Sequence, residues 1–373
     1  MSETKFQHYM LKEIFENPAA VRDTVVPRIS PEGKIRFEGL RISEDELRRV
    51  KQIHILASGT SRHAGLAGKI MIQELAGVHV DVDYASEFQY ANPATSSHEL
   101  TIVITQSGET SDTIAAMLGA AANGSKTIAI VNVVESQIAK KADSVIVTHA
   151  GPEISIASTK AFTAQLAVLF MLAVYLGELR GTLSQQDARK HLEELKALPS
   201  KIEAVLKTNL LCEKLAEKYS MATDFLFLGR SVHHPAALDG ALKLKEVSYI
   251  HAEAYPTGEL KHGPYALIDA MLPIVCIATC DSQDALSVQR YKSSLQLMRD
   301  VKERNGRIIA VAVEGSEEVS EITRDIIYVP AASELLLPMI EIVPLQLLAY
   351  HIALQRGLNV DKPRNLVKAV TDQ

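Results

Sequence analysis

Several features that mark common classes of protein are scarce or missing in this sequence. Tryptophan is absent, and aromatic residues make up only 5% of the 373 residues. The three cysteines, Cys212, Cys276 and Cys280, are too few and too scattered for a disulfide framework, so we expect reduced thiols. The formal net charge is −6 and no basic arm or stripe is present, which argues against a nucleic-acid partner.

The sequence also lacks the segments that direct a chain to a membrane. The residues that follow Met1 do not form the apolar core of a signal peptide. The longest apolar run, residues 166–176, has eleven residues, which is too short to span a bilayer. No group of His, Cys and Asp residues has the spacing of metal ligands, and we expect neither a metal nor another cofactor. These absences favour a reduced, cytoplasmic setting without a membrane.

What is present is an alternation of apolar strand patterns with helical patterns. Apolar, β-branched runs such as residues 102–104 predict buried strands, and longer apolar stretches such as residues 162–179 predict helices. Strands that alternate with helices predict an α/β fold, in which a parallel sheet carries helices on both faces. After Ser58, Gly59, Thr60 and Ser61, which predict a turn, we expect a helix over residues 64–76.

The pattern occurs twice in the chain. Residues 55–61 align with residues 226–232 at an offset of 171, and residues 127–131 align with residues 308–312 at an offset of 181. We therefore predict two tandem doubly wound units, the second with an insertion of about ten residues. The predicted organisation is a helical lead-in (1–50), a first domain (51–184), a helical connector (185–223), a second domain (224–357) and a C-terminal tail (358–373).

The first unit carries a candidate anion site. Its apolar strand ends in Thr105-Gln-Ser-Gly-Glu-Thr110, and a helix is predicted directly afterwards. Backbone N–H groups at a helix N-terminus attract anions, and short hydroxyls reach their oxygens. Neither a nucleotide P-loop nor a dinucleotide loop is present, so a monophosphate is the natural ligand. A hydroxyl cluster that only caps the helix is the alternative that this pattern leaves open.

Three further positions are candidates for catalysis, each with a structural alternative. Lys243 and Glu246 share one face of a largely apolar helix, where they transfer protons or simply form a salt bridge. His262 lies in a glycine-flanked loop, as a catalyst or as an ordinary surface residue. Lys368 lies in the tail, where a lysine is usually solvated.

Six segments, taken together, resemble the sugar-isomerase (SIS) half of the glutamine–fructose-6-phosphate transaminase (isomerising) family. They extend over nearly the whole chain and occur in the family's order. The resemblance implies a fold of two tandem SIS units and fructose 6-phosphate, glucosamine 6-phosphate and glucose 6-phosphate as substrates or products. The segments are residues 58–61, 105–110, 157–162, 240–246, 258–264 and 363–368.

The resemblance also implies a role for each matching residue. Glu246 would be the base that moves a proton between C1 and C2, with Lys243 assisting at the hydroxyl oxygens. Lys368 would form an imine with the C2 carbonyl, and His262 would open the sugar ring from the neighbouring subunit of a homodimer. The binding residues implied are Thr105, Gln106, Ser107 and Thr110 for the phosphate, and Thr60, Ser61, Ile156, Ser158 and Val367 for the sugar.

The glutaminase half of that family begins with a nucleophilic cysteine, whereas this sequence begins with Met1 and Ser2. The chain is then either the isomerase half of a longer enzyme, with a glutaminase domain or subunit as its partner, or an enzyme that works alone. Residues 8–24 resemble the family's stretch just after the interdomain linker, which favours the first. With ammonia supplied elsewhere it would make glucosamine 6-phosphate, and without ammonia it would make glucose 6-phosphate. The alternatives are a stand-alone glucosamine-6-phosphate deaminase and a sugar-phosphate sensor without catalysis.

Overall fold

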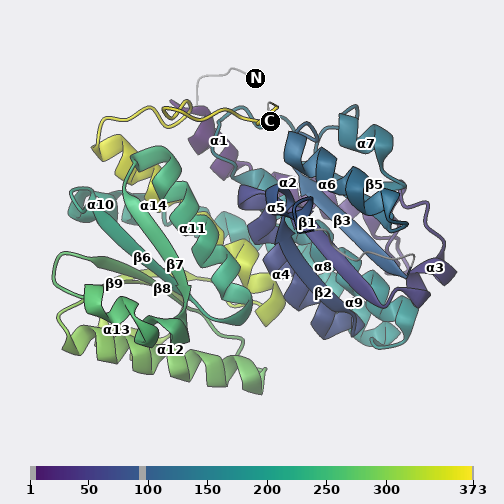
Figure 1. Cartoon of the computed structure of the whole chain (residues 1–373). Coiled ribbons are helices and arrows are strands. Elements are labelled where there is room, and N and C mark those ends of the chain that lie inside the picture. Colours follow the sequence, from purple (N-terminus) through teal and green to yellow (C-terminus); the bar gives the residue numbers. More distant parts are fainter. Residues whose placement is uncertain (1–5, 92–97, 372–373) are drawn as a thin grey trace. The chain divides into compact units, whose positions relative to one another are not determined.

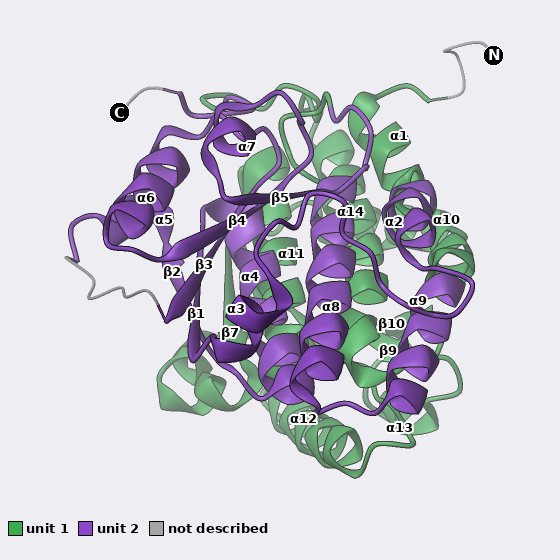
Figure 2. Cartoon of the chain, turned by 90° about the vertical axis from the view of Figure 1, so that its right-hand side faces the viewer, with its two compact units in different colours: residues 1–18, 154–159, 198–366 green, residues 19–153, 160–197, 367–373 purple. Residues whose placement is uncertain are grey.

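The computed structural model describes residues 6–91 and 98–371, which form two compact units with one five-stranded sheet each (Figures 1 and 2). The chain passes between the units several times, so each unit combines segments that are distant in sequence. Unit 1, green in Figure 2, comprises residues 1–18, 154–159 and 198–366, and unit 2, purple, comprises residues 19–153, 160–197 and 367–373.

The helices and strands of the first half include every strand of the unit 2 sheet. In chain order they are α1 (Tyr9–Phe15), α2 (Asn17–Val25), the 3-10 helix η1 (Val26–Arg28), α3 (Glu44–Arg49), β1 (Gln52–Ala57), α4 (Gly59–Ala76), β2 (His79–Tyr84), α5 (Ala85–Phe88), β3 (Glu99–Thr105), α6 (Ser111–Ala122), β4 (Lys126–Val131), α7 (Gln137–Lys141), β5 (Ser144–Val147), α8 (Lys160–Arg180) and α9 (Gln185–Leu206).

The elements of the second half include every strand of the unit 1 sheet. They are α10 (Asn209–Tyr219), β6 (Asp224–Gly229), η2 (Ser231–His233), α11 (His234–Ser248), β7 (His251–Pro256), η3 (Thr257–His262), η4 (Pro264–Leu267), β8 (Pro273–Ala278), α12 (Ala285–Glu303), β9 (Arg307–Val313), α13 (Glu317–Ile322), β10 (Asp325–Val329), η5 (Glu334–Leu336) and α14 (Leu337–Gln355).

The two sheets have the same topology. The strand order is β2-β1-β3-β4-β5 in unit 2 and β7-β6-β8-β9-β10 in unit 1, and the neighbouring strands in both sheets are parallel. This confirms the predicted α/β fold of two tandem doubly wound units. The insertion in the second unit lies in α12, which has 19 residues, whereas its counterpart α6 has 12.

Both faces of the unit 2 sheet are buried at its central strands, because β3 and β4 are apolar at nearly every position. One face, including Leu56 and Val103, packs against α5, α6 and α7. On the other face Ile55 and Ile104 contact α4 near Gly65, and α4 packs against α8 (Figure 1). Continuous apolar strands of this kind are typical of parallel sheets that helices cover on both sides.

The unit 1 sheet is covered in the same way. One face, including Leu226 and Ile274, packs against α12 and α13. On the other face Phe227 lies against Gly240 of α11, which also approaches Leu345 of α14. The three cysteines are free thiols, and the buried Cys276 belongs to β8. Burial raises the pKa of the Cys276 thiol to about 12, so this thiol stays protonated.

Some predicted boundaries differ from the observed ones. The lead-in contains α3, whose N-cap Ser43 accepts from the Glu46 N–H in a capping box. The predicted turn at residues 58–61 is wrong, because α4 already begins at Gly59 and includes Thr60 and Ser61 in its first turn. The predicted helical connector is interrupted between α9 and α10, at Lys207 and Thr208.

Two helices are long and apolar enough to cross a membrane by length and composition alone: α8 and the stretch Glu334–Gln355. The most apolar window of α8 is 83% buried inside the protein, and that of Glu334–Gln355 is 100% buried. α8 packs mainly against α4, and α14 packs mainly against α11 and α10, as core helices of α/β units do.

Candidate active site

The strand order of the unit 2 sheet reverses between β1 and β3. From β1 the chain crosses through α4 to β2, and from β3 it crosses through α6 to β4 on the other side. At such a point the loops after the two strands diverge and leave a crevice at the carboxyl ends, where ligands of open α/β sheets bind. The N-termini of α4 and α6 both begin at these strand ends.

The loop after β3 turns tightly on its own hydroxyl groups. The Thr105 hydroxyl accepts a hydrogen bond from the Gly108 N–H (3.3 Å), and the Ser107 hydroxyl accepts one from the Glu109 N–H (3.2 Å). Gly108 has φ +68°, and a Cβ there would lie 2.1 Å from Ser136 Oγ. Only glycine therefore fits at this position.

A second layer of hydrogen bonds holds this loop on α7. Both carboxylate oxygens of Glu109 accept from Gln137, one from its backbone N–H (2.9 Å) and one from its side-chain amide (2.8 Å). These hydrogen bonds hold the pKa of the Glu109 carboxyl below its usual value. The Gly108 carbonyl accepts from the Ile138 N–H (3.2 Å). The loop is thus rigid before any ligand binds.

The ends of α4 and α6 distinguish between the two interpretations of the hydroxyl cluster. Within residues 6–91 and 98–371, the side chains of Ser58 and Thr110, the N-cap residues of these helices, make no capping hydrogen bond. A cluster that served only to cap α6 would use Thr110 in that way. The absence of these side-chain caps favours the anion site.

Thr60 and Ser61 lie in the first turn of α4 and are each 9% exposed. The Ser61 hydroxyl accepts a hydrogen bond from the side-chain amide of Gln165 on α8 (3.0 Å). Because Ser61 accepts here, its own proton stays available for a ligand oxygen.

The C-terminal tail lies against the same loop region of unit 2. The Val370 carbonyl accepts from the backbone N–H of Ser111 (3.1 Å), the first residue of α6. Two residues earlier, Lys368 Nζ donates to Glu153 Oε2 (2.7 Å). Val367, next to this lysine, is largely exposed. Unit 2 therefore contains the predicted phosphate loop, two of the predicted sugar-binding hydroxyls (Thr60 and Ser61) and the predicted imine lysine.

The other predicted catalytic residues belong to unit 1. Lys243 and Glu246 both lie on α11, and the Lys243 ammonium donates to Glu246 Oε2 (2.5 Å). The Lys243 side chain is fully buried, whereas that of Glu246 is 21% exposed. The carboxylate is thus open to a ligand while its partner is shielded. His262 is exposed at the end of η3, directly before Gly263.

Ile156 and Ser158 lie in a short loop of unit 1 that two acidic residues hold in place. The buried Glu13 of α1 accepts from the backbone N–H groups of Ile154 (2.5 Å) and Ser155 (3.3 Å). The Asp361 carbonyl accepts from the Ile156 N–H (3.1 Å). These contacts explain why a lead-in helix accompanies the two sheets: α1 is part of the support for this loop.

The equivalent place in the unit 1 sheet is filled by a buried ionic network. His233, after β6, contacts Glu341 Oε1 through Nδ1 (2.7 Å) and Glu334 Oε1 through Nε2 (3.0 Å). Thr279, after β8, donates to Glu341, and Arg290 donates to Glu334. Side chains occupy the space at these strand ends, in keeping with the prediction that only the first unit binds phosphate.

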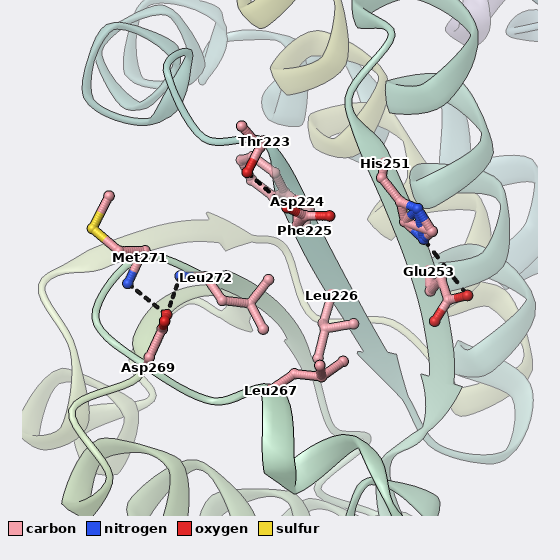
Figure 3. A pocket seen from close by; sticks show the side chains of 10 residues that line it. All are labelled: Thr223, Asp224, Phe225, Leu226, His251, Glu253, Leu267, Asp269, Met271 and Leu272. Atoms are coloured by element: carbon pink, nitrogen blue, oxygen red, sulfur yellow. Dashed lines mark hydrogen bonds and ion pairs between the residues drawn. The ribbon is translucent and has the colours of Figure 1, made fainter.

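A cavity of about 290 Å³ lies elsewhere in unit 1 (Figure 3). It is lined by residues at the amino ends of strands, including Asp224 of β6 and His251 of β7. Ligands of open α/β sheets bind at the opposite, carboxyl ends, and no predicted site residue lines this cavity. The described residues contain no group of three or more His, Cys, Asp and Glu residues that could bind a metal ion.

Comparison with known proteins agrees with this architecture. The family model of the SIS domain matches residues 46–175 and residues 219–356, one stretch for each sheet. The chain belongs to the SIS domain family. Each SIS domain contains one of the duplicated sheets, and the hydroxyl-rich loop after β3 lies in the first SIS domain.

Curated relatives extend beyond this chain. Glutamine–fructose-6-phosphate aminotransferase (isomerizing) of Chlorobaculum tepidum is 49% identical over 98% of the chain and 58% of the relative's length. The chain thus spans about three fifths of this relative. A solved C-terminal domain of glucosamine-fructose-6-phosphate aminotransferase from Francisella tularensis is 36% identical, with a TM-score of 0.89 over 97% of this chain and 100% of that one. These matches confirm the resemblance inferred from the six segments.

A third likeness concerns the fold alone. The structure of glucosamine-6-phosphate deaminase from Thermotoga maritima matches with a TM-score of 0.72 over 97% of this chain and 99% of that one, at 21% identity.

Three residues that hold predicted site residues in place were not predicted from the sequence: Glu153, Glu13 and Glu109. Glu109 lies in the predicted loop, but the other two lie beside no motif, and only their contacts identify them.

Proposed function

We propose that this chain is the isomerase module of glucosamine-6-phosphate synthesis. It converts fructose 6-phosphate to glucosamine 6-phosphate with ammonia supplied elsewhere, and to glucose 6-phosphate when ammonia is absent. The observation that carries this proposal is the contact of Val370 with the start of α6, which brings the lysine-bearing tail to the phosphate loop within one unit. The names of the Chlorobaculum and Francisella relatives support the choice of substrate.

In this proposal the loop after β3 binds the phosphate. The hydroxyls of Thr105, Ser107 and Thr110, the Gln106 amide and the N-terminus of α6 are the donors. Oxygens of a phosphate carry the negative charge that an uncapped helix N-terminus attracts. The sugar lies among Thr60, Ser61, Ile156, Ser158 and Val367.

The carbonyl end of the sugar then reacts with the catalytic groups. The Lys368 amine forms an imine with C2 of the open ketose, which acidifies the C1 protons. Glu246 takes a proton from C1 and returns it at C2, and the hydrogen bond from the buried Lys243 ammonium orients that carboxylate. Both exchanges are reversible, so ketose and aldose phosphates interconvert.

A product assay tests this function. The purified chain is incubated with fructose 6-phosphate, alone, with ammonium or with glutamine, and the sugar phosphates are identified by mass spectrometry and NMR. We expect glucose 6-phosphate in all three, and glucosamine 6-phosphate with ammonium but not with glutamine. Binding without any product would instead make the chain a sensor and overturn the proposal.

We further propose that the module works as a homodimer in which His262 opens the sugar ring bound by the other subunit. The exposed position of His262 supports this arrangement, because the residue is accessible to a second copy. Co-expressed His262→Ala and Lys368→Ala chains test it. Random pairing leaves about a quarter of the sites with both residues intact, so about a quarter of the activity returns. No recovery would mean that both residues act in the same subunit.

The ammonia source and the setting follow from the same proposal. A glutaminase domain or subunit supplies ammonia, which accounts for the greater length of the curated relatives. Phosphorylated sugars are substrates of the cytoplasm, and we place the module there.

A further inference from the structure

A buried carboxylate lies next to the amine of Lys368. The Glu153 side chain is fully buried, while that of Lys368 is 26% exposed, and 2.7 Å separates Glu153 Oε2 from Lys368 Nζ. The second oxygen, Oε1, accepts a hydrogen bond from the backbone N–H of Ala161 (3.1 Å) in the first turn of α8. All three residues belong to unit 2.

This surrounding holds the Glu153 carboxylate in place, because the hydrogen bond from Ala161 at the start of α8 fixes the orientation of the carboxylate plane. Lys368 donates to the other oxygen of this carboxylate. The ammonium form of a lysine is not a nucleophile. For an imine to form, this ammonium must lose a proton to a group within hydrogen-bonding distance.

We propose that Glu153 is the proton-transfer partner of Lys368 in imine formation. The inference rests on the proposed function, and it assigns a role to a residue outside every motif of the sequence. Glu153 contacts the reacting nitrogen directly through Oε2, so it can both accept the proton and return it.

The steps balance in protons and electrons. The Lys368 ammonium transfers a proton to the Glu153 carboxylate, which yields a neutral amine and a carboxylic acid. The amine lone pair forms a bond to C2 of the sugar, and the carbonyl π electrons move to oxygen, which takes the proton lost by nitrogen. Glu153 then returns its proton to that hydroxyl, the C2–O bond breaks, and water leaves. The product is a protonated imine beside a carboxylate, with the same total charge as at the start.

Trapping the imine tests the role of Glu153. Fructose 6-phosphate and cyanoborohydride are added to the full chain, and mass spectrometry follows the sugar adduct on the peptide that contains Lys368. The variants are Glu153→Gln, which keeps the shape and the acceptor for Ala161 but takes up no proton, and Glu153→Asp, which keeps the carboxylate. The matched control is Glu135→Gln, with the same change of charge in unit 2 at a side chain that is 86% exposed. Lys368→Ala gives the background.

We expect Glu153→Gln to form the adduct at least about 100-fold more slowly than the control at pH 7, because a positioned acid–base group contributes on that order. Glu153→Asp recovers part of the rate. In Glu153→Gln only the free amine of Lys368 reacts, and its fraction rises with pH. The ratio of the Glu153→Gln rate to the control rate therefore rises by up to about tenfold per pH unit. Thermal unfolding and fructose 6-phosphate binding, measured by calorimetry, remain close to those of the control.

Each other outcome has a distinct meaning. If the control itself forms no adduct at Lys368, the proposed imine chemistry fails, and the role of Glu153 fails with it. If Glu153→Gln matches the control at pH 7, Glu153 has no part in proton transfer and the inference is overturned while the function stands. A deficit of the same size at every pH also overturns it, because that result means Glu153 only holds Lys368 in place.

Discussion

The Val370 carbonyl accepts a hydrogen bond from the backbone N–H of Ser111, a residue 259 positions earlier in the chain. Ser111 is the first residue of α6, directly after the phosphate loop, and Val370 is two residues after Lys368. The tail therefore makes its contact at the helix N-terminus that we propose for phosphate binding. This single contact connects the predicted binding loop to the predicted nucleophile.

Replacing Ser111 with proline should release the tail without disturbing α6. Proline is favoured at the first position of a helix and removes the N–H that donates to Val370, together with the Ser111 hydroxyl, which donates to the same carbonyl (3.4 Å). Thr110 has φ −67° and ψ 117°, which a residue before proline adopts readily. Losing one hydrogen bond worth about 1 kcal/mol should lower isomerase turnover up to about tenfold. Ser111→Ala, which keeps the N–H, is the control, and equal turnover of the two variants would show that the contact does not position Lys368.

The tight turn of the phosphate loop makes Gly108 indispensable. Gly108→Ala places a Cβ against Ser136 and strains a residue at φ +68°, at a cost of about 1–3 kcal/mol. We expect a higher KM for fructose 6-phosphate and a lower Tm. Gly119→Ala, in α6 with open space around it, should leave KM unchanged and gain about 0.5–1 kcal/mol of stability. An unchanged KM in Gly108→Ala would show that this loop does not bind the phosphate.

Glu246→Gln should abolish the exchange of the C1 proton with solvent. A positioned base contributes about 10²–10⁴-fold, and the amide has no proton affinity near neutral pH. NMR of fructose 6-phosphate in D₂O measures the exchange directly, and calorimetry shows whether binding is retained. Glu217→Gln, an exposed position on α10, is the charge-matched control. If Glu246→Gln exchanges the C1 proton as fast as the control, a residue other than Glu246 is the base.

The buried network around His233 should stabilise unit 1 as a coupled set. Replacing His233 with Gln leaves the buried Glu341 with the Thr279 hydroxyl but without its histidine partner, which costs about 3–5 kcal/mol. Replacing His233 and Glu341 together with Gln should cost less, because Glu334 keeps Arg290. Urea unfolding of the two variants measures this difference. A double variant that is less stable than His233→Gln would contradict the coupling.

The same network predicts a pH dependence. Burial alone would lower the pKa of His233, but Glu341 and Glu334 outweigh it and raise the pKa from 6.5 to about 10. A raised pKa contributes stability that is complete below pH 6.5 and is lost as the pH rises towards 10. The stability advantage of the natural chain over the double Gln variant should therefore shrink between pH 6.5 and 10, by at most roughly 1.4 kcal/mol per unit. A constant advantage would mean that His233 is neutral.

Most of the fold could be predicted because parallel sheets leave a strong mark on sequence. Strands such as β3 and β9 are buried on both faces and appear as continuous apolar runs, and equal offsets between such runs reveal the duplication. No strand was predicted at β7, an edge strand whose residues His251 and Glu253 interrupt any apolar run. The first turn of α4 was predicted as a turn because glycine and hydroxyl residues favour turns as well as helix starts.

The site could be predicted only in part. The phosphate loop is local, so its residues are adjacent in the sequence and identify it together. The pair of Glu153 and Lys368 joins positions 215 residues apart, and Glu153 lies in none of the six segments. His233 and Glu341 are similarly distant, 108 residues apart. Contacts of this kind depend on how the chain folds back on itself, which no periodicity or local motif encodes.

A crystal structure of the chain with bound fructose 6-phosphate tests the central claim most directly. The account predicts phosphate oxygens within hydrogen-bonding distance of Ser107 and Thr110, with C2 of the sugar facing Lys368 Nζ. A phosphate bound at any other place, such as the cavity in Figure 3, would contradict it.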